Sequence, residues 1–103
     1  MLKAAFIFVA PGANSTEHRS VIATPAVELT TLGVSDYQAA VAAVKELVAQ
    51  GTAAIELCGG FGHEGVALVK QAAGTQTAVG AVRFDAHPGL AGKSGDDVFS
   101  KAK

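Results

Sequence analysis

The sequence predicts a small α/β domain with a four-stranded, mainly parallel sheet and helices on its faces. Apolar runs of strand length alternate along the chain with segments of helical periodicity, a pattern typical of parallel sheets. The chain has 103 residues, enough for one domain, and only 6% of them are aromatic, which favours helices lying close on the sheet. We therefore expect residues 1–103 to form one domain, with residues 86–103 as an irregular C-terminal tail.

The first half of the chain predicts two strands joined by a short helix. Residues 2–9 are apolar nearly throughout and end at a Pro-Gly pair, as a buried central strand does. Residues 11–16 are turn formers, and Asn14, Ser15 or Thr16 would cap a short helix that continues to Ile22. Residues 27–34 then predict a second strand with more polar content.

The second half predicts two longer helices and two further strands. Ser35 begins a capping-box pattern ahead of an amphipathic helix, and Gly51 stands where a left-handed C-cap residue belongs. Residues 53–58 form the third predicted strand, residues 64–73 the next helix and residues 77–85 the fourth strand.

Right-handed crossovers then favour the strand order 2-1-3-4, that of a truncated flavodoxin-like sheet. A ligand crevice is expected beyond the carboxyl ends of the first and third strands, where the winding reverses. In this order the two longer helices cover one face of the sheet and leave the other thinly covered. A poorly covered face favours association, so we predict a homo-oligomer.

The charge and composition of the chain limit the kinds of molecule that it is expected to bind. The formal net charge is −1 and the isoelectric point is near 6.2, so we expect neither a nucleic-acid partner nor an anionic membrane surface. No apolar stretch reaches the length of a bilayer span. The single cysteine, Cys58, suits a reducing compartment, and we expect a cytoplasmic protein. Cys58 is either an inert core residue or a thiolate at a helix N-terminus.

A glycine-rich turn joins the third strand to the helix that follows it. The segment from Gly60 to Gly65 fits G-x-G-x-x-G, and Asp85 follows twenty residues later, as in a dinucleotide fingerprint. Glu64 would place a negative charge beside the phosphate, which argues against that use. The alternatives are a tight turn that permits close helix packing, or a binding turn for a smaller ligand. If the turn binds a smaller ligand, we assign ligand-binding roles to Gly59, Gly60, Phe61 and Gly62.

Three histidines, His18, His63 and His87, follow the first, third and fourth strands, so the topology places all three on one rim of the sheet. Glu64 and Asp85 are expected on the same rim. A carboxylate beside an imidazole orients the ring and tunes its pKa for general acid–base work. We assign catalytic roles to His63, His87, Glu64 and Asp85, and a ligand-binding role to His18.

Cations on the same rim would recognise negative charge. Arg83 can hold a carboxylate or phosphate with two hydrogen bonds. Lys93 and Ser94 end a segment that resembles the tail of a P-loop and would contribute to a small anion site. The competing interpretations are that Arg83 and Asp85 pair with neighbours such as Glu56, and that the segment from His87 onward is a solvated tail.

Three motifs together resemble a known family. They are AFIFVAPGA near the N-terminus, IELCGGFGHEG in the middle, and RFDAHPGLAGKSGDDVF near the C-terminus. They resemble a family of small bacterial proteins of about this length whose function is unknown. The resemblance covers nearly the whole chain. It implies a compact α/β domain in which these loops matter, and it brings no established activity.

The functional hypothesis is a pocket for a small polar or anionic metabolite. If the protein is an enzyme, we expect proton transfer in a lyase, isomerase or hydrolase step without an organic cofactor. His63 or His87 would be the base, Arg83 the anchor for the substrate, and the backbone N–H groups of Gly60–Gly62 would stabilise negative charge. The alternatives are a non-catalytic sensor with the same pocket, and a metal-binding protein that uses His18, His63 and His87.

Overall fold

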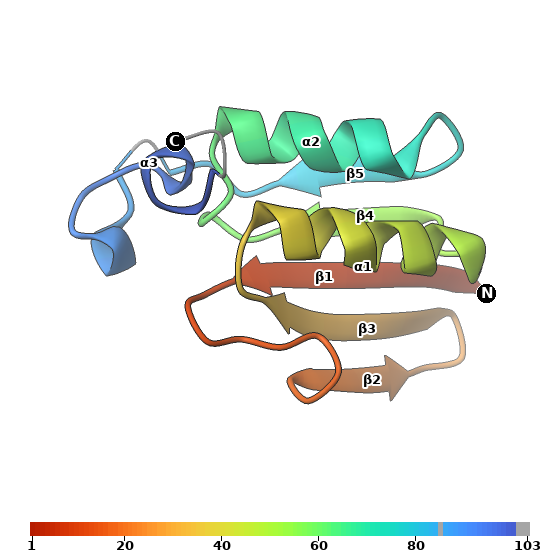
Figure 1. Ribbon diagram of the computed structural model, residues 1–103. Helices are drawn as coiled ribbons and strands as arrows, with labels where there is room; N and C mark the ends of the chain where they lie inside the picture. The colour runs from red at the N-terminus through yellow and green to blue at the C-terminus, as the bar shows by residue number, and fades with distance from the viewer. Residues whose placement is uncertain (85, 101–103) are drawn as a thin grey trace.

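The computed structural model describes residues 1–84 and 86–100 and shows an α/β fold in which a five-stranded sheet carries two long helices (Figure 1). The strands are β1 (Leu2–Val9), β2 (Arg19–Ala23), β3 (Val27–Val34), β4 (Ala54–Leu57) and β5 (Ala78–Ala81). The helices are α1 (Tyr37–Ala49), α2 (His63–Ala73), the 3-10 turn η1 (Pro88–Leu90) and α3 (Gly95–Phe99).

The sheet is mixed and mostly parallel. Its order is β2-β3-β1-β4-β5. Strand β1 pairs in parallel with β3 and β4, and β4 pairs in parallel with β5. The four strands predicted from the sequence therefore occur in the predicted order, with β1 at the centre.

The predicted number of strands was wrong, because the segment expected to be a short helix ending at Ile22 is strand β2. Asn14 does cap a turn, since its side chain accepts hydrogen bonds from the backbone of Thr16 and Glu17, but no helix continues from it. Instead β2 runs antiparallel to β3, and the hydroxyl of Thr24 closes the connection by accepting from the backbone of Val27 at 2.9 Å. The β-branched residues in β2 favour a strand over a helix.

Helix α1 begins at a different cap from the one expected. The side chain of Asp36, not that of Ser35, accepts from the backbone N–H of Ala39 at 2.8 Å. Asp36 is extended, which brings its carboxylate over the first turn. The helix then buries Tyr37, Ala40, Ala43, Val44 and Leu47.

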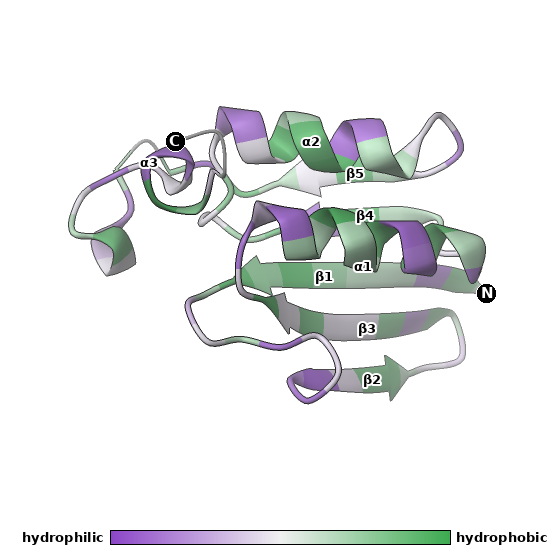
Figure 2. Cartoon of the chain, in the orientation of Figure 1, coloured by the Kyte–Doolittle hydropathy of each residue, from purple (hydrophilic) through white to green (hydrophobic). Residues whose placement is uncertain are grey.

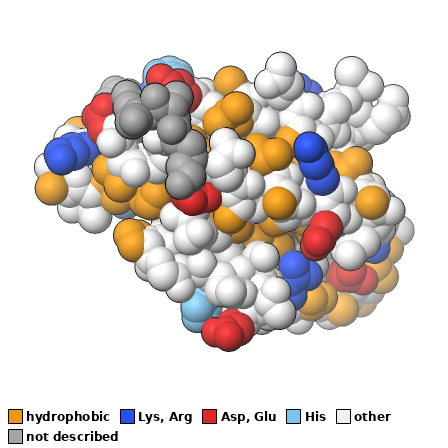
Figure 3. Space-filling view, viewed as in Figure 1, with side chains coloured by type: hydrophobic (Ala, Val, Ile, Leu, Met, Phe, Trp, Pro, Cys, Tyr) orange, Lys and Arg blue, Asp and Glu red, His pale blue; other side chains and the backbone are white. Residues whose placement is uncertain are grey.

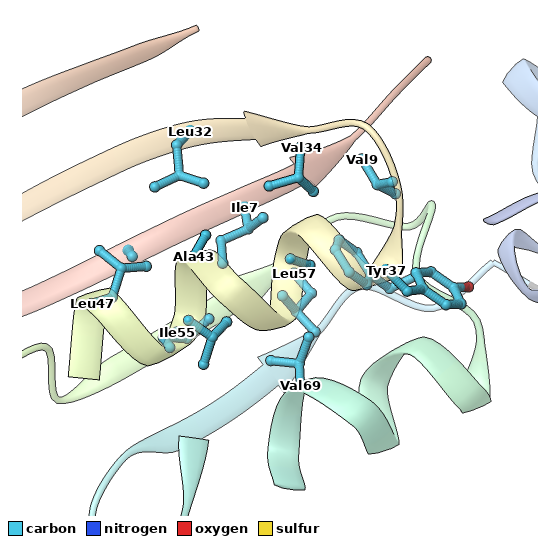
Figure 4. Close-up of a cluster of buried hydrophobic side chains, with 14 of the residues drawn as sticks. Ile7, Val9, Leu32, Val34, Tyr37, Ala43, Leu47, Ile55, Leu57 and Val69 are labelled. Atoms are coloured by element: carbon cyan, nitrogen blue, oxygen red, sulfur yellow. The ribbon is translucent and has the colours of Figure 1, made fainter. Parts of the chain in front are cut away.

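The core lies between the two long helices and one face of the sheet (Figure 4). Alternate residues of β1 and β4 point into it, so Ile7, Ile55 and Leu57 are at most 1% exposed. Both helices contribute side chains to this core, α1 through Leu47 and α2 through Val69 (Figure 4). The polar parts of α1 and α2 face away from the sheet (Figure 2).

The position of α1 and α2 on the same face of the sheet is a consequence of the crossovers. The connections that contain α1 and α2 both step across the sheet in the direction from β3 towards β5, so right-handed crossovers place both helices on the same side. The connection from β1 to β3 steps the other way and would place a helix on the opposite face. Here that connection is strand β2, which widens the sheet instead.

The C-terminal segment lies beyond the carboxyl ends of the parallel strands. The tail that the sequence predicted as irregular contains η1 and α3 within its described part, and both lie at this end of the sheet (Figure 1). Within residues 1–84 and 86–100, no helix is both long and apolar enough to cross a membrane.

A pair of valine truncations tests the position of the core. Val44 is 0% exposed and Val21 is 54% exposed. We expect Val44→Ala to lower the free energy of unfolding by about 2 kcal/mol or more, because it removes two buried methyl groups and leaves a cavity. Val21→Ala should change it by less than about 0.5 kcal/mol. Urea denaturation measures both, and equal losses would contradict this placement of the core.

Candidate functional site at the carboxyl edge of the sheet

The carboxylate of Asp96, in α3, lies on the N-terminus of α2. Its oxygens accept hydrogen bonds from the backbone N–H groups of Glu64, at 3.0 and 3.2 Å, and of Gly65, at 3.2 Å. These are N–H groups of the first helical turn, which have no partner within the helix. The helix N-terminus carries partial positive charge that favours an anion there. Asp96 thus caps α2 from 31 or 32 residues away in the sequence.

Tyr37 links this cap to the core. Its hydroxyl donates to Asp96 Oδ1 at 2.8 Å and accepts from the backbone N–H of Gly62 at 3.0 Å. Its ring is fully buried and stacks on the ring of Phe61, with the ring centroids 5.6 Å apart. The centroid of the Phe99 ring lies 6.1 Å from that of Tyr37. One side chain at the start of α1 therefore joins α2 to α3.

The network sets the protonation of both groups. Burial raises the pKa of Tyr37 well above its ordinary value, so the hydroxyl keeps the proton that it donates to Asp96. Burial would also raise the pKa of Asp96, but hydrogen bonds from the Glu64 backbone, Tyr37 and the Gly65 backbone, together with nearby His63, lower it below 3.8. The carboxylate is ionised at neutral pH.

The backbone N–H groups of the glycine-rich turn donate hydrogen bonds within the chain. The N–H of Gly60 donates to the sulfur of Cys58, that of Phe61 to the carbonyl of Cys58, and that of Gly62 to Tyr37. These groups are therefore not available to stabilise negative charge on a ligand. Phe61 itself is 1% exposed and belongs to the core.

The glycines of the G-x-G-x-x-G pattern serve close packing. A Cβ on Gly62 would come within 2.5 Å of the Asp96 carboxyl group, and one on Gly65 would come within 2.5 Å of the Tyr37 ring. The space that a pyrophosphate would need at this helix N-terminus is filled by Asp96. Of the three interpretations of the motif, the tight turn with close packing describes the structure, and dinucleotide binding does not fit it.

His63 and Arg83 meet at the outer side of this network. His63 is the first residue of α2, and Arg83 follows β5. The guanidinium Nη2 lies 2.8 Å from His63 Nε2, and both side chains are exposed. Arginine only donates, so Nε2 accepts and a neutral ring carries its proton on Nδ1. Glu64, also exposed, is the next residue of α2.

Phe84 and His87 form a second ring pair beside this turn. The ring centroids are 4.8 Å apart with an interplanar angle of 27°, and the Phe84 ring lies against Gly59. His87 Nδ1 accepts from the backbone N–H of Gly89, which fixes the start of η1.

The P-loop-like segment has a structural role in the part that is described. Ser94 caps α3 by accepting from the backbone N–H of Asp96 at 3.1 Å, and Lys93 pairs through its backbone with His87. The Lys93 side chain is exposed. Asp85, predicted as a catalytic residue, lies outside the described residues.

His18 does not join the other histidines. It precedes β2, which pairs with β3 at the far edge of the sheet from β5. Its ring accepts from the backbone N–H of Asn14 at 2.9 Å. In residues 1–84 and 86–100, no three histidine, cysteine or acidic side chains lie close enough together to hold a metal ion, so the metal site proposed for the three histidines is not supported.

Tyr37 and Asp96 are the residues that sequence reasoning missed. The sequence pattern places Tyr37 in the amphipathic helix that follows Ser35 and Asp96 in the C-terminal tail, without a role in the site for either residue. The contact joins a tyrosine at the start of α1 to an acid in the short helix α3. These residues are 59 positions apart, and no spacing rule in the sequence connects them.

Residues 2–97 match a protein family described only as a family of unknown function (DUF6506), and the chain belongs to it. This confirms the resemblance to a family of unknown function and assigns no activity. No match was found among curated proteins or among solved structures.

The Asp96 cap predicts an acid-sensitive stability. Because the folded pKa of Asp96 is lowered, its contribution is fully present above the unfolded value of 3.8 and is lost as the pH falls through the folded value. Asp96→Asn should remove this part of the acid dependence, measured by urea denaturation between about pH 7 and 2. The neighbouring Asp97→Asn is the control. An unchanged acid dependence in Asp96→Asn would contradict the assignment.

Gly65 predicts a steric effect. Tyr37 is buried between other rings and cannot yield to a methyl group, so Gly65→Ala should destabilise the fold by about 1–3 kcal/mol despite the better helix propensity of alanine. A Cβ on Gly80 meets nothing within 4 Å, so Gly80→Ala should be nearly neutral. Thermal unfolding of the two variants and the parent protein measures both effects. A Gly65→Ala variant as stable as the parent would show that this packing is not as tight as described.

Proposed function

We propose that the protein binds a small anionic metabolite at the carboxyl edge of the sheet, with Arg83 and His63 as its principal contacts. The observation that carries this proposal is the 2.8 Å approach of the Arg83 guanidinium to His63 Nε2. The two side chains come from different elements, and both are exposed where the parallel strands end. In open α/β sheets this end is where ligands bind.

The chemistry of the pair suits carboxylates and phosphates. A guanidinium carries five N–H donors in a planar fork, so Arg83 can hold an anion with two hydrogen bonds. The imidazole offers a donor or an acceptor according to its protonation. The ligand is recognised by side chains, because Asp96 already occupies the N–H groups of Glu64 and Gly65 at the helix terminus.

The surroundings of the pair support its use as a site. His63 begins the helix that Asp96 and Tyr37 hold in place, so its backbone is fixed from two sides. Phe84, next to Arg83, stacks on His87 and provides an aromatic surface close by. Charged side chains are scattered over the helix side of the molecule without a single basic patch (Figure 3), so the site favours a small anion over a polyanion.

Proton transfer is the catalytic extension of this proposal. When a substrate anion takes over the Arg83 hydrogen bond, His63 Nε2 is released to act as a general base, with Glu64 the nearest acid along α2. No organic cofactor is needed for such a step. A non-catalytic sensor would use the same two contacts, and measured turnover separates the two.

Ligand titration tests the site. Inorganic phosphate and a panel of small di- and tricarboxylates are titrated while the amide shifts of the protein are followed by NMR. We expect one class to bind, and Arg83→Ala to weaken its binding by about tenfold to a hundredfold, the loss of a charge-assisted hydrogen bond. Arg19→Ala, at the opposite edge of the sheet, is the matched control and should bind normally.

Two outcomes would overturn the proposal. One is a panel in which no anion shifts the amides around residues 63 and 83. The other is Arg83→Ala binding as tightly as the parent, or Arg19→Ala losing binding to the same extent.

A further inference from the structure

The face of the sheet opposite the helices is apolar. Residues that alternate with the core residues of β1 point to this side, namely Ala4, Phe6 and Phe8. The register places Leu29 of β3 beside Ala4, and Ile22 of β2 beside Leu29. We call this surface the outer face. Its main apolar residues are Leu2, Phe6, Phe8, Ile22, Leu29 and Val82.

Several of these side chains are more exposed than hydrophobic residues of a covered sheet. Leu2 is 45% exposed, Ile22 57% and Val82 51%. Within the described chain, no helix lies on this face, because the connection that would have carried one is strand β2. The outer face is therefore a contiguous apolar surface spread over the sheet, a type of surface that marks an interaction site.

We propose that a second copy of this chain covers the outer face and forms a face-to-face homodimer. The size of the face fits. Five strands about 4.8 Å apart and up to eight residues long give roughly 500 Å² of projected area per copy. Two copies together then cover about 1,000 Å² or more, the amount that a specific interface needs.

The charge of the outer face also favours its own copy. Among its described strand residues, Glu56 is the one ionisable side chain, and its register neighbours are Phe6 and Gly80. This surface suits neither nucleic acid nor an anionic membrane, both of which are bound through Lys and Arg. Two apolar sheet faces pack on each other at about 10 Å with strands within about 30°, an arrangement that a two-fold axis generates.

A hollow in the outer face offers a place for the partner. Phe6, Glu56, Gly80 and Val82 help to line a depression of about 250 Å³. A Cβ on Gly80 would meet nothing within 4 Å, so the floor of the hollow is open. An apolar side chain of the second copy entering it would bury Phe6, and the Glu56 carboxylate would stay at the rim in water.

Adjacent residues of β2 provide the test. Ile22 lies on the outer face, whereas Val21 points to the helix side, and they are 57% and 54% exposed. Sedimentation equilibrium at about 1–100 μM should give the parent protein a mass twice the 10.3 kDa of one chain. Ile22→Lys should shift the dimer towards monomer by at least about a hundredfold in Kd, because it places a charge in an apolar interface. Val21→Lys should remain dimeric.

Each contrary result overturns the proposal. A parent protein that is monomeric at about 100 μM shows that the outer face does not bind a second copy. Equal dissociation of Ile22→Lys and Val21→Lys points to edge-to-edge pairing of β2, a different interface. Val82→Lys, on the far side of the outer face, is a second variant that should also dissociate the dimer, and circular dichroism confirms that each variant is folded. None of these results depends on ligand binding at Arg83.

Discussion

The carboxylate of Asp96 on the N-terminus of α2 is the contact on which the carboxyl edge of the sheet depends. It satisfies the N–H groups of Glu64 and Gly65, accepts from the Tyr37 hydroxyl, and thereby ties α3 to the two long helices. A short helix such as α3, with five residues, has little stability of its own. Helix α3 stays in place because the carboxylate of its Asp96 caps the N-terminus of α2, where a negative charge is favourable.

This contact decides what the edge can bind. In many α/β proteins a glycine-rich turn leads to a helix whose N–H groups hold a phosphate. In this chain the same turn leads to a helix whose N–H groups already hold a carboxylate of the protein. Recognition of a ligand therefore passes to the side chains outside the cap, where His63 and Arg83 lie 2.8 Å apart.

Much of the fold could be predicted from the sequence, because periodicity reports burial. The apolar run of β1 and the amphipathic pattern of α1 identified these two elements, and crossover handedness gave the order of the parallel strands. Strand β2 was missed because its five exposed residues carry no periodic signal, and only pairing with β3 makes them a strand. The approach of His63 to Arg83 followed from topology. The Asp96 cap could not be predicted, since it joins α3 to α2 through contacts between residues with no common motif.

NMR titration of the Glu64 and Gly65 amide protons tests the central claim most directly. Both N–H groups donate to Asp96, so their chemical shifts should move together with one midpoint below pH 3.8 and should not show this titration in Asp96→Asn. If the two amides do not titrate with a common midpoint, or titrate identically in Asp96→Asn, the cap described here does not exist.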